Sequence, residues 1–157
     1  MALSKDEIKT AYPLPVYNYK VEIGSDAVAF SEVSGLSISY ETATYKESPV
    51  ASGIPGPRVM HMPMQGTPAN VTLKKGLVRG VSVATFFNWI NSTQINQVDK
   101  KDIYIRLMDE NGDPVISWKV TNAFPTKLDA PSFTADSNDV AVESMEVMGD
   151  GIFIEEA

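Results

Sequence analysis

This chain has few residues that could act in catalysis or bind a metal ion, and their spacing does not suit either role. The sequence has a single histidine, His61, and no cysteine, which excludes disulfides and thiolate metal sites. Residues 80–84 (Gly-Val-Ser-Val-Ala) resemble the tight turn that exposes a nucleophilic serine in hydrolases. That arrangement needs a histidine downstream of the serine, and His61 lies upstream. We therefore expect no serine hydrolase.

Two acidic arrangements also fail on geometry. In residues 109–113 the glycine comes too early for a calcium-binding EF-hand loop, and Val120 stands where the bidentate glutamate would be needed. Glu143 and Glu146 fall in an expected strand with a spacing that directs their side chains to opposite faces. They cannot act on one substrate as acid and base. We predict no enzymatic activity, no cofactor and no metal.

Charge is distributed unevenly along the chain. The net charge of -7 argues against a general nucleic-acid binder, which would present a basic face. Residues 128–157 carry acidic side chains and no Lys or Arg, whereas Lys74, Lys75 and Arg79 lie close together. Two interpretations remain open: solvated faces that keep the protein in solution, or complementary patches that meet between copies of the chain.

No stretch of the sequence predicts a membrane segment. The apolar runs fall short of the roughly 18 residues of a spanning helix. The polar N-terminus also lacks the apolar core of a secretory signal. The absence of cysteine fits synthesis in a reducing cytoplasm. We expect no membrane insertion by this chain.

Alternation of apolar and polar residues predicts the elements. It is typical of half-buried strands over residues 17–23, 27–33, 36–45, 71–73, 102–108, 116–121, 140–148 and 152–154. Asn111-Gly112 favours a hairpin turn with two positive φ angles. Residues 82–92 predict the one helix, with Ser82 as its N-cap and Phe86 on its apolar face. The chain is expected to be one domain, 1–157, mainly β with one α-helix.

A Pro-, Gly- and Met-rich loop is predicted at about residues 46–68. Its prolines make a regular strand or helix improbable. Its methionines are adaptable apolar side chains that suit docking onto a neighbouring copy, the alternative being a flap folded on its own core. The candidate inter-subunit residues are Arg58, Met60, Met62, Met64, Lys74, Lys75, Glu143 and Glu146.

Several segments resemble the tail-tube proteins of contractile phages and of phage-derived injection machines. They are residues 30–36 (Phe-Ser-Glu-Val-Ser-Gly-Leu), 73–76 (Leu-Lys-Lys-Gly), 87–90 (Phe-Asn-Trp-Ile) and 122–126 (Asn-Ala-Phe-Pro-Thr). Residues 12–15 and 100–103 are most similar to tubes of extracellular contractile injection systems, of the anti-feeding-prophage and virulence-cassette type. The resemblance covers nearly the whole chain.

The resemblance implies an antiparallel β-barrel or sandwich that assembles into hexameric rings, which stack into a tube around a lumen. It implies as partners other copies of the chain, a sheath protein, baseplate and spike hub proteins, and a protein effector or DNA as cargo. Assembly in the bacterial cytoplasm would precede release in an extracellular particle or virion. The long loop also fits a tube-initiator ring next to the spike. The alternatives are a phage tail tube that conducts DNA and a small-ligand-binding β-barrel.

Overall fold

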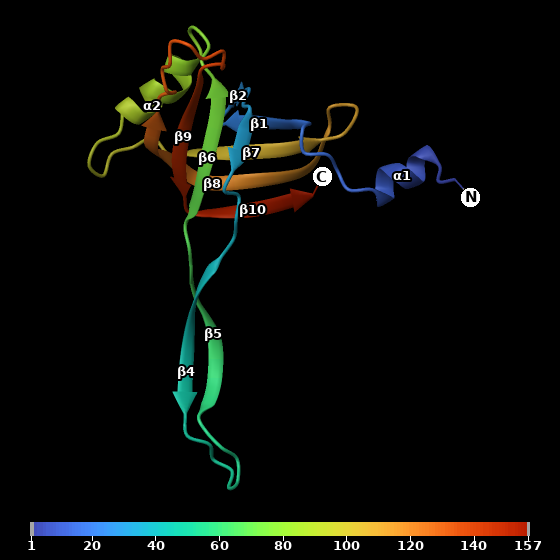
Figure 1. The fold of residues 1–157 in the computed structure, drawn as a ribbon, viewed down its shortest axis with the longest axis vertical. Coiled ribbons are helices and arrows are strands. Elements are labelled where there is room, and N and C mark those ends of the chain that lie inside the picture. The colour runs from blue at the N-terminus through green and yellow to red at the C-terminus, as the bar shows by residue number, and fades with distance from the viewer. Residues whose placement is uncertain (1, 157) are drawn as a thin grey trace.

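The computed structural model describes residues 2–156 as a β-sheet body from which two segments project (Figure 1). One is a long β-hairpin that forms one end of the molecule along its longest axis. The other is the N-terminal helix α1 (Lys5–Ala11), which stands away from the sheets. Both projections expose side chains that a self-sufficient domain would cover.

The body is a sheet in which every pairing is antiparallel. Its strand order is β2-β1-β7-β8-β9-β6-β3, and β10 pairs with β8 off this path. The strands are β1 (Tyr19–Ile23), β2 (Asp26–Val28), β3 (Glu32–Ser34), β6 (Ala69–Gly76), β7 (Lys101–Met108), β8 (Pro114–Asp129), β9 (Val142–Gly149) and β10 (Gly151–Glu156). This architecture confirms the predicted mainly β, antiparallel fold.

Strand β8 joins the two halves of the body. Its first half pairs with β7 and β10, and its second half pairs with β9. Asn122 stands between the two halves with a φ of 50°. Its backbone N–H donates to the Asp102 carboxylate at 3.0 Å, and its side-chain amide donates to Asp150 at 2.8 Å. These bonds fix the corner at which the sheet bends into two layers.

The core lies between these layers and under a helical segment. That segment consists of a π-helical turn, η1 (Val83–Phe87), followed by α2 (Asn88–Asn91). Phe86 and Trp89 are its buried residues, and the Trp89 indole donates to the Asp99 carbonyl at 2.7 Å. Leu73 of β6 is fully buried, so truncating it to Ala would cost about 2–5 kcal/mol.

The helix predicted over 82–92 is confirmed, but the expected cap is wrong. The Ser82 hydroxyl does not cap the helix; it accepts the Val78 N–H of the preceding turn at 3.0 Å. The turn between β7 and β8 also differs from the expected form, because only Gly112 has a positive φ, of 81°. The Asp109 carboxylate accepts the N–H groups of Asn111 and Asp113, both at 2.9 Å, and holds a wider turn.

The prediction that no regular strand runs through the loop at about residues 46–68 is wrong. Strands β4 (Tyr40–Glu47) and β5 (Arg58–Gly66) form the projecting hairpin, and residues 48–57 form its tip. Pro63 lies inside β5, where proline is tolerated because a two-stranded sheet has free outer edges. The prolines of the tip lie outside both strands, as turn residues do.

Two other expectations need adjusting, and one element was missed. The strand expected over 27–33 is divided into β2 and β3, and the strand expected over 36–45 begins only at Tyr40. Helix α1 was not predicted at all. None of the helices in the described part of the chain is long and apolar enough to cross a membrane.

Candidate self-association surfaces

The hairpin exposes more apolar surface than two strands can cover. Tyr40, Tyr45, Met62 and Met64 are exposed, and β4 and β5 pair only with each other. An isolated two-stranded hairpin is marginally stable at best in water. Within its own subunit the hairpin therefore has no further strand to pair with.

The pairing register gives the hairpin two different faces. One face carries the predicted residues Arg58, Met60, Met62 and Met64, with Glu47, Tyr45 and Ala43 as cross-strand partners of the first three. The other face carries Thr44, His61, Lys46 and Val59. The methionine face is continuous and apolar, and Arg58 ends it near the tip, 3.7 Å from Glu47. All four hairpin candidates thus share one surface.

The other four candidates divide between the surface and the interior. Lys74 lies on the surface and pairs with Glu32 of the same subunit at 3.1 Å. Glu146 is exposed on β9, on the face opposite to Glu143, as strand alternation requires. Lys75 and Glu143 are only 3% and 7% exposed. These two lie inside the subunit, across from each other on β6 and β9.

Helix α1 presents an exposed surface that was not predicted. The sequence contains a capping box, Ser4 with Glu7 three residues later, from which the helix could have been predicted. The Glu7 N–H donates to the Ser4 hydroxyl at 3.2 Å, and the Ser4 N–H donates to the Glu7 carboxylate at 2.7 Å. No residue of the helix is buried. A helix this short gains little stability from its own hydrogen bonds, so it needs a packing partner.

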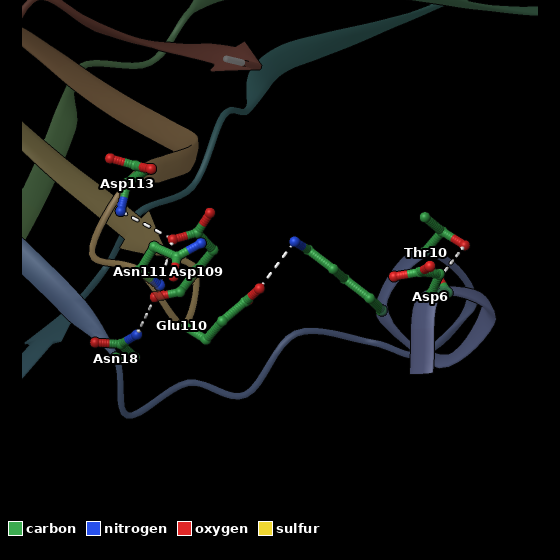
Figure 2. A network of polar contacts seen from close by, with 8 residues as sticks. Asp6, Thr10, Asn18, Asp109, Glu110, Asn111 and Asp113 are labelled. Atoms are coloured by element: carbon green, nitrogen blue, oxygen red, sulfur yellow. Dashed lines mark hydrogen bonds and ion pairs between the residues drawn. The ribbon is translucent and has the colours of Figure 1, made fainter. Parts of the chain in front are cut away.

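A small polar network links this helix to the β7–β8 turn (Figure 2). The Lys9 ammonium lies 2.8 Å from the Glu110 carboxylate. This contact raises the pKa of Lys9 and lowers the pKa of Glu110. Farther along the arm, the Asn18 amide donates to the Asp109 carbonyl at 2.9 Å. The arm is therefore held to the body mainly by polar contacts at the surface.

The body also has open sheet edges. Strands β2 and β10 end the half of the sheet that contains β1, β7 and β8, and β10 confirms the edge strand predicted at 152–154. Phe153 and Ile154 of β10 are both 58% exposed. Unpaired edges that carry exposed apolar residues are ready to pair with another chain.

The described residues form an open apolar pocket but no cluster of metal-binding side chains. An apolar pocket of about 410 Å³ opens to solvent beside β3, and its lining includes Tyr19, Val33, Leu36, Ile105 and Trp118. Among residues 2–156, no group of three or more His, Cys, Asp or Glu side chains could hold a metal ion. His61 is exposed on β5, where its Nδ1 lies 3.1 Å from the Thr44 hydroxyl.

Comparison with known proteins identifies a family. Residues 15–152 match the model of the T4-like virus tail tube protein gp19 family. No curated protein sequence matches the chain significantly.

Solved structures resemble the chain over nearly its full length. A chain of an extracellular contractile injection system, the PVC sheath–tube complex in its extended state, is 40% identical, with a TM-score of 0.89 over 99% of this chain and 100% of that one. A chain of the anti-feeding prophage cap, which terminates its tube, is also 40% identical, with a TM-score of 0.85 over 100% of both. A chain of the PVC sheath/tube terminator is 43% identical, with a TM-score of 0.82 over 92% and 97%.

Proposed function

The chain belongs to the T4-like virus tail tube protein gp19 family, and from this membership we propose that it builds the inner tube of an extracellular contractile injection particle. The observation that carries the proposal is its likeness, over 99% of its length, to a chain of the PVC sheath–tube complex. In this role the protein works by self-association rather than by catalysis.

Ring formation would use the open sheet edges. Pairing β10 of one copy with β2 of the next would extend the sheet from subunit to subunit, and closure into a hexamer would leave neither of these two edges free. The exposed Phe153 and Ile154 would be covered at the same contact. This head-to-tail pairing closes when the rotation between copies divides a full turn.

Stacking of rings would use the hairpin. Its methionine face offers adaptable apolar side chains, and Arg58 adds a charge near its tip. Lys74 and Glu146 remain at the surface of the body, where they would contribute to the register between neighbouring copies. We assign no inter-subunit contact to the buried Lys75 and Glu143.

The remaining partners follow from the same role. A sheath protein would surround the tube, baseplate and spike hub proteins would start it, and its lumen would hold a protein effector or DNA. Assembly would take place in the bacterial cytoplasm before release of the particle. Both a main-tube ring and a tube-initiator ring satisfy this proposal.

Electron microscopy of the purified protein tests it. The unaltered protein should form rings and tubes, and long tubes in the absence of other proteins indicate a main-tube subunit, whereas isolated rings indicate an initiator. Changing Met60, Met62 and Met64 together to Ser should leave rings but prevent tubes. The matched control changes Thr44 and His61, on the other face of the hairpin, to Ser and should stack normally. Normal tubes from the methionine variant would exclude the hairpin role, and a strictly monomeric unaltered protein would exclude the tube.

A further inference from the structure

The turn between β7 and β8 contains the only Asn-Gly pair of the sequence, Asn111 followed by Gly112. Both residues are exposed, and a Cβ atom at Gly112 would meet nothing within 4 Å. Glycine has no side chain that would crowd its own backbone nitrogen, so a preceding asparagine side chain can reach that nitrogen easily. The pair therefore has the composition and the exposure of a site of spontaneous chemical modification.

The reaction that such a pair undergoes is deamidation. The Gly112 backbone nitrogen loses its proton and attacks the side-chain carbonyl carbon of Asn111, which closes a cyclic imide. The side-chain nitrogen takes up the proton and leaves as ammonia. A water molecule then opens the imide. Breaking its bond to the side-chain carbonyl carbon gives aspartate, whereas breaking its bond to the main-chain carbonyl carbon gives isoaspartate, in which the chain runs through the former side chain.

The structure holds the turn closed against this reaction (Figure 2). The Asp109 carboxylate accepts the N–H groups of Asn111 and Asp113, both at 2.9 Å. The Gly112 N–H donates to the Asp109 carbonyl at 3.1 Å. The nitrogen that must lose its proton is therefore engaged in a hydrogen bond. Deamidation requires the turn to open first, and the contacts of Asp109 set how often it opens.

The N-terminal arm strengthens this closure from outside the turn. The Lys9 ammonium contacts the carboxylate of Glu110, the residue directly before Asn111, at 2.8 Å. The Asn18 amide donates to the Asp109 carbonyl at 2.9 Å. Opening of the turn displaces the groups to which the arm is bound. The exposure of the reactive nitrogen and the release of the arm are therefore coupled.

We propose that Asn111 is a deamidation site whose rate is set by the Asp109 contacts, and that its isoaspartate product releases helix α1. In isoaspartate the β-carbon becomes part of the main chain. The backbone between the N–H groups of residue 111 and Asp113 is then longer, so one carboxylate cannot hold both. The turn widens, and Glu110 loses its position opposite Lys9. This modification concerns the subunit itself and is additional to the proposed function.

Ageing of the purified protein in mildly alkaline buffer tests the site, since a low proton concentration favours the deprotonated nitrogen. Peptide mass spectrometry should show faster deamidation at Asn111 than at Asn138, which is also exposed but precedes Asp139. Asp109→Ala should speed the reaction at Asn111 by at least about tenfold, because it removes two hydrogen bonds to a charged group. Lys9→Gln removes only the ion pair of the arm and should speed the reaction less. Equal rates at Asn111 and Asn138, or an unchanged rate in both variants, would overturn the assignment.

Hydrogen exchange of residues 5–11 tests the consequence. Aged protein that a protein-isoaspartate methyltransferase labels at residue 111 should have lost the protection of the helix, and fresh protein should keep it. Asn111→Gln is the matched control, because its longer side chain closes the imide ring far more slowly, and it should stay protected through the same ageing. Fresh Asn111→Asp carries the charge without the longer backbone and should also stay protected. Loss of protection in fresh Asn111→Asp, or full protection in the isoaspartate form, would overturn the release of the helix by backbone lengthening.

Discussion

Lys75 and Glu143 lie directly opposite each other on β6 and β9, both almost completely buried, without forming an ion pair. The Lys75 ammonium donates to the Gly76 carbonyl at 3.0 Å. Within the described residues, Oε1 of Glu143 has no hydrogen-bond partner. Cross-strand neighbours lie close enough for their side chains to interact, although no ion pair joins these two.

Removing one of the two charges should cost more than removing both. Lys75→Met leaves Glu143 as an uncompensated buried carboxylate and should lower the free energy of unfolding by about 1–3 kcal/mol. Adding Glu143→Gln to Lys75→Met should recover part of this loss, because the carboxylate charge is gone. Urea unfolding of the unassembled protein measures both effects as a double-mutant cycle. Strictly additive effects would show that the two side chains do not interact.

The attachment of helix α1 should depend on pH at both extremes. The pKa of Glu110 is held below its ordinary value of 4.5. The contribution of Glu110 to the attachment of the helix is therefore complete above that pH and is lost as the pH falls through the lowered pKa. The pKa of Lys9 is raised above its ordinary value of 10.5, so its contribution is present below that pH and is lost as the pH rises through the raised pKa. The helix should remain attached between these limits and detach outside them.

Hydrogen exchange of residues 5–11 at pH 7 and in acid would follow this detachment, and added salt should promote it because both side chains are exposed. After correction for the intrinsic exchange rate at each pH, Lys9→Gln should show at pH 7 the low protection factors that the unaltered protein shows in acid. Equal protection of the helix in both proteins at pH 7 would mean that the ion pair does not hold the arm.

Gly35 should be far less replaceable than Gly53, although both have positive φ angles, of 87° and 83°. A Cβ atom at Gly35 would overlap the backbone carbonyl of Asn70, whereas one at Gly53 would meet nothing within 4 Å. Gly53→Ala should therefore cost only the backbone strain, about 1 kcal/mol. Gly35→Ala should cost roughly 2 kcal/mol more, because the clash with Asn70 adds to the strain. Thermal unfolding of the two variants gives the comparison, and equal losses would rule out a clash.

The methionines of the hairpin should report on assembly through their oxidation. Met62 and Met64 are 41% and 53% exposed, so dilute peroxide should convert both to sulfoxides in unassembled protein. In tubes the same residues should be protected, because the hairpin would be covered. Peptide mass spectrometry measures the difference. Met145, which is fully buried in the body, serves as the internal control and should stay unoxidised in both forms. Equal oxidation of Met62 in tubes and unassembled protein would contradict the predicted contact.

Most of the body was predictable because apolar and polar residues alternate clearly along its strands. In β7, Ile103 and Ile105 are buried and their neighbours are not, so the pattern in the sequence is the pattern of burial. Of the hairpin, β4 lies largely within the strand expected over 36–45, but β5 was not predictable from the same rule. Proline normally argues against a strand, but Pro63 stands in a ribbon with open edges, where a missing N–H is tolerated.

The docking role of the methionines of β5 stays a prediction. It was drawn from apolar side chains on a long proline-rich connection, and the structure shows this connection to be a ribbon whose methionines share one face. Lys75 and Glu143 could not be placed from sequence, because single charges normally indicate a surface and only the pairing of β6 with β9 encloses them.

The hairpin also has a mechanical consequence. Its strands run along the longest axis of the molecule and leave the body at Ser39 and Thr67, whose hydroxyls are hydrogen bonded to each other. An axial pull on the tip is shared by two covalent backbones in tension, while the hydrogen bonds between β4 and β5 lie across the direction of the load. Force can pass from the tip to the body without breaking any of those bonds.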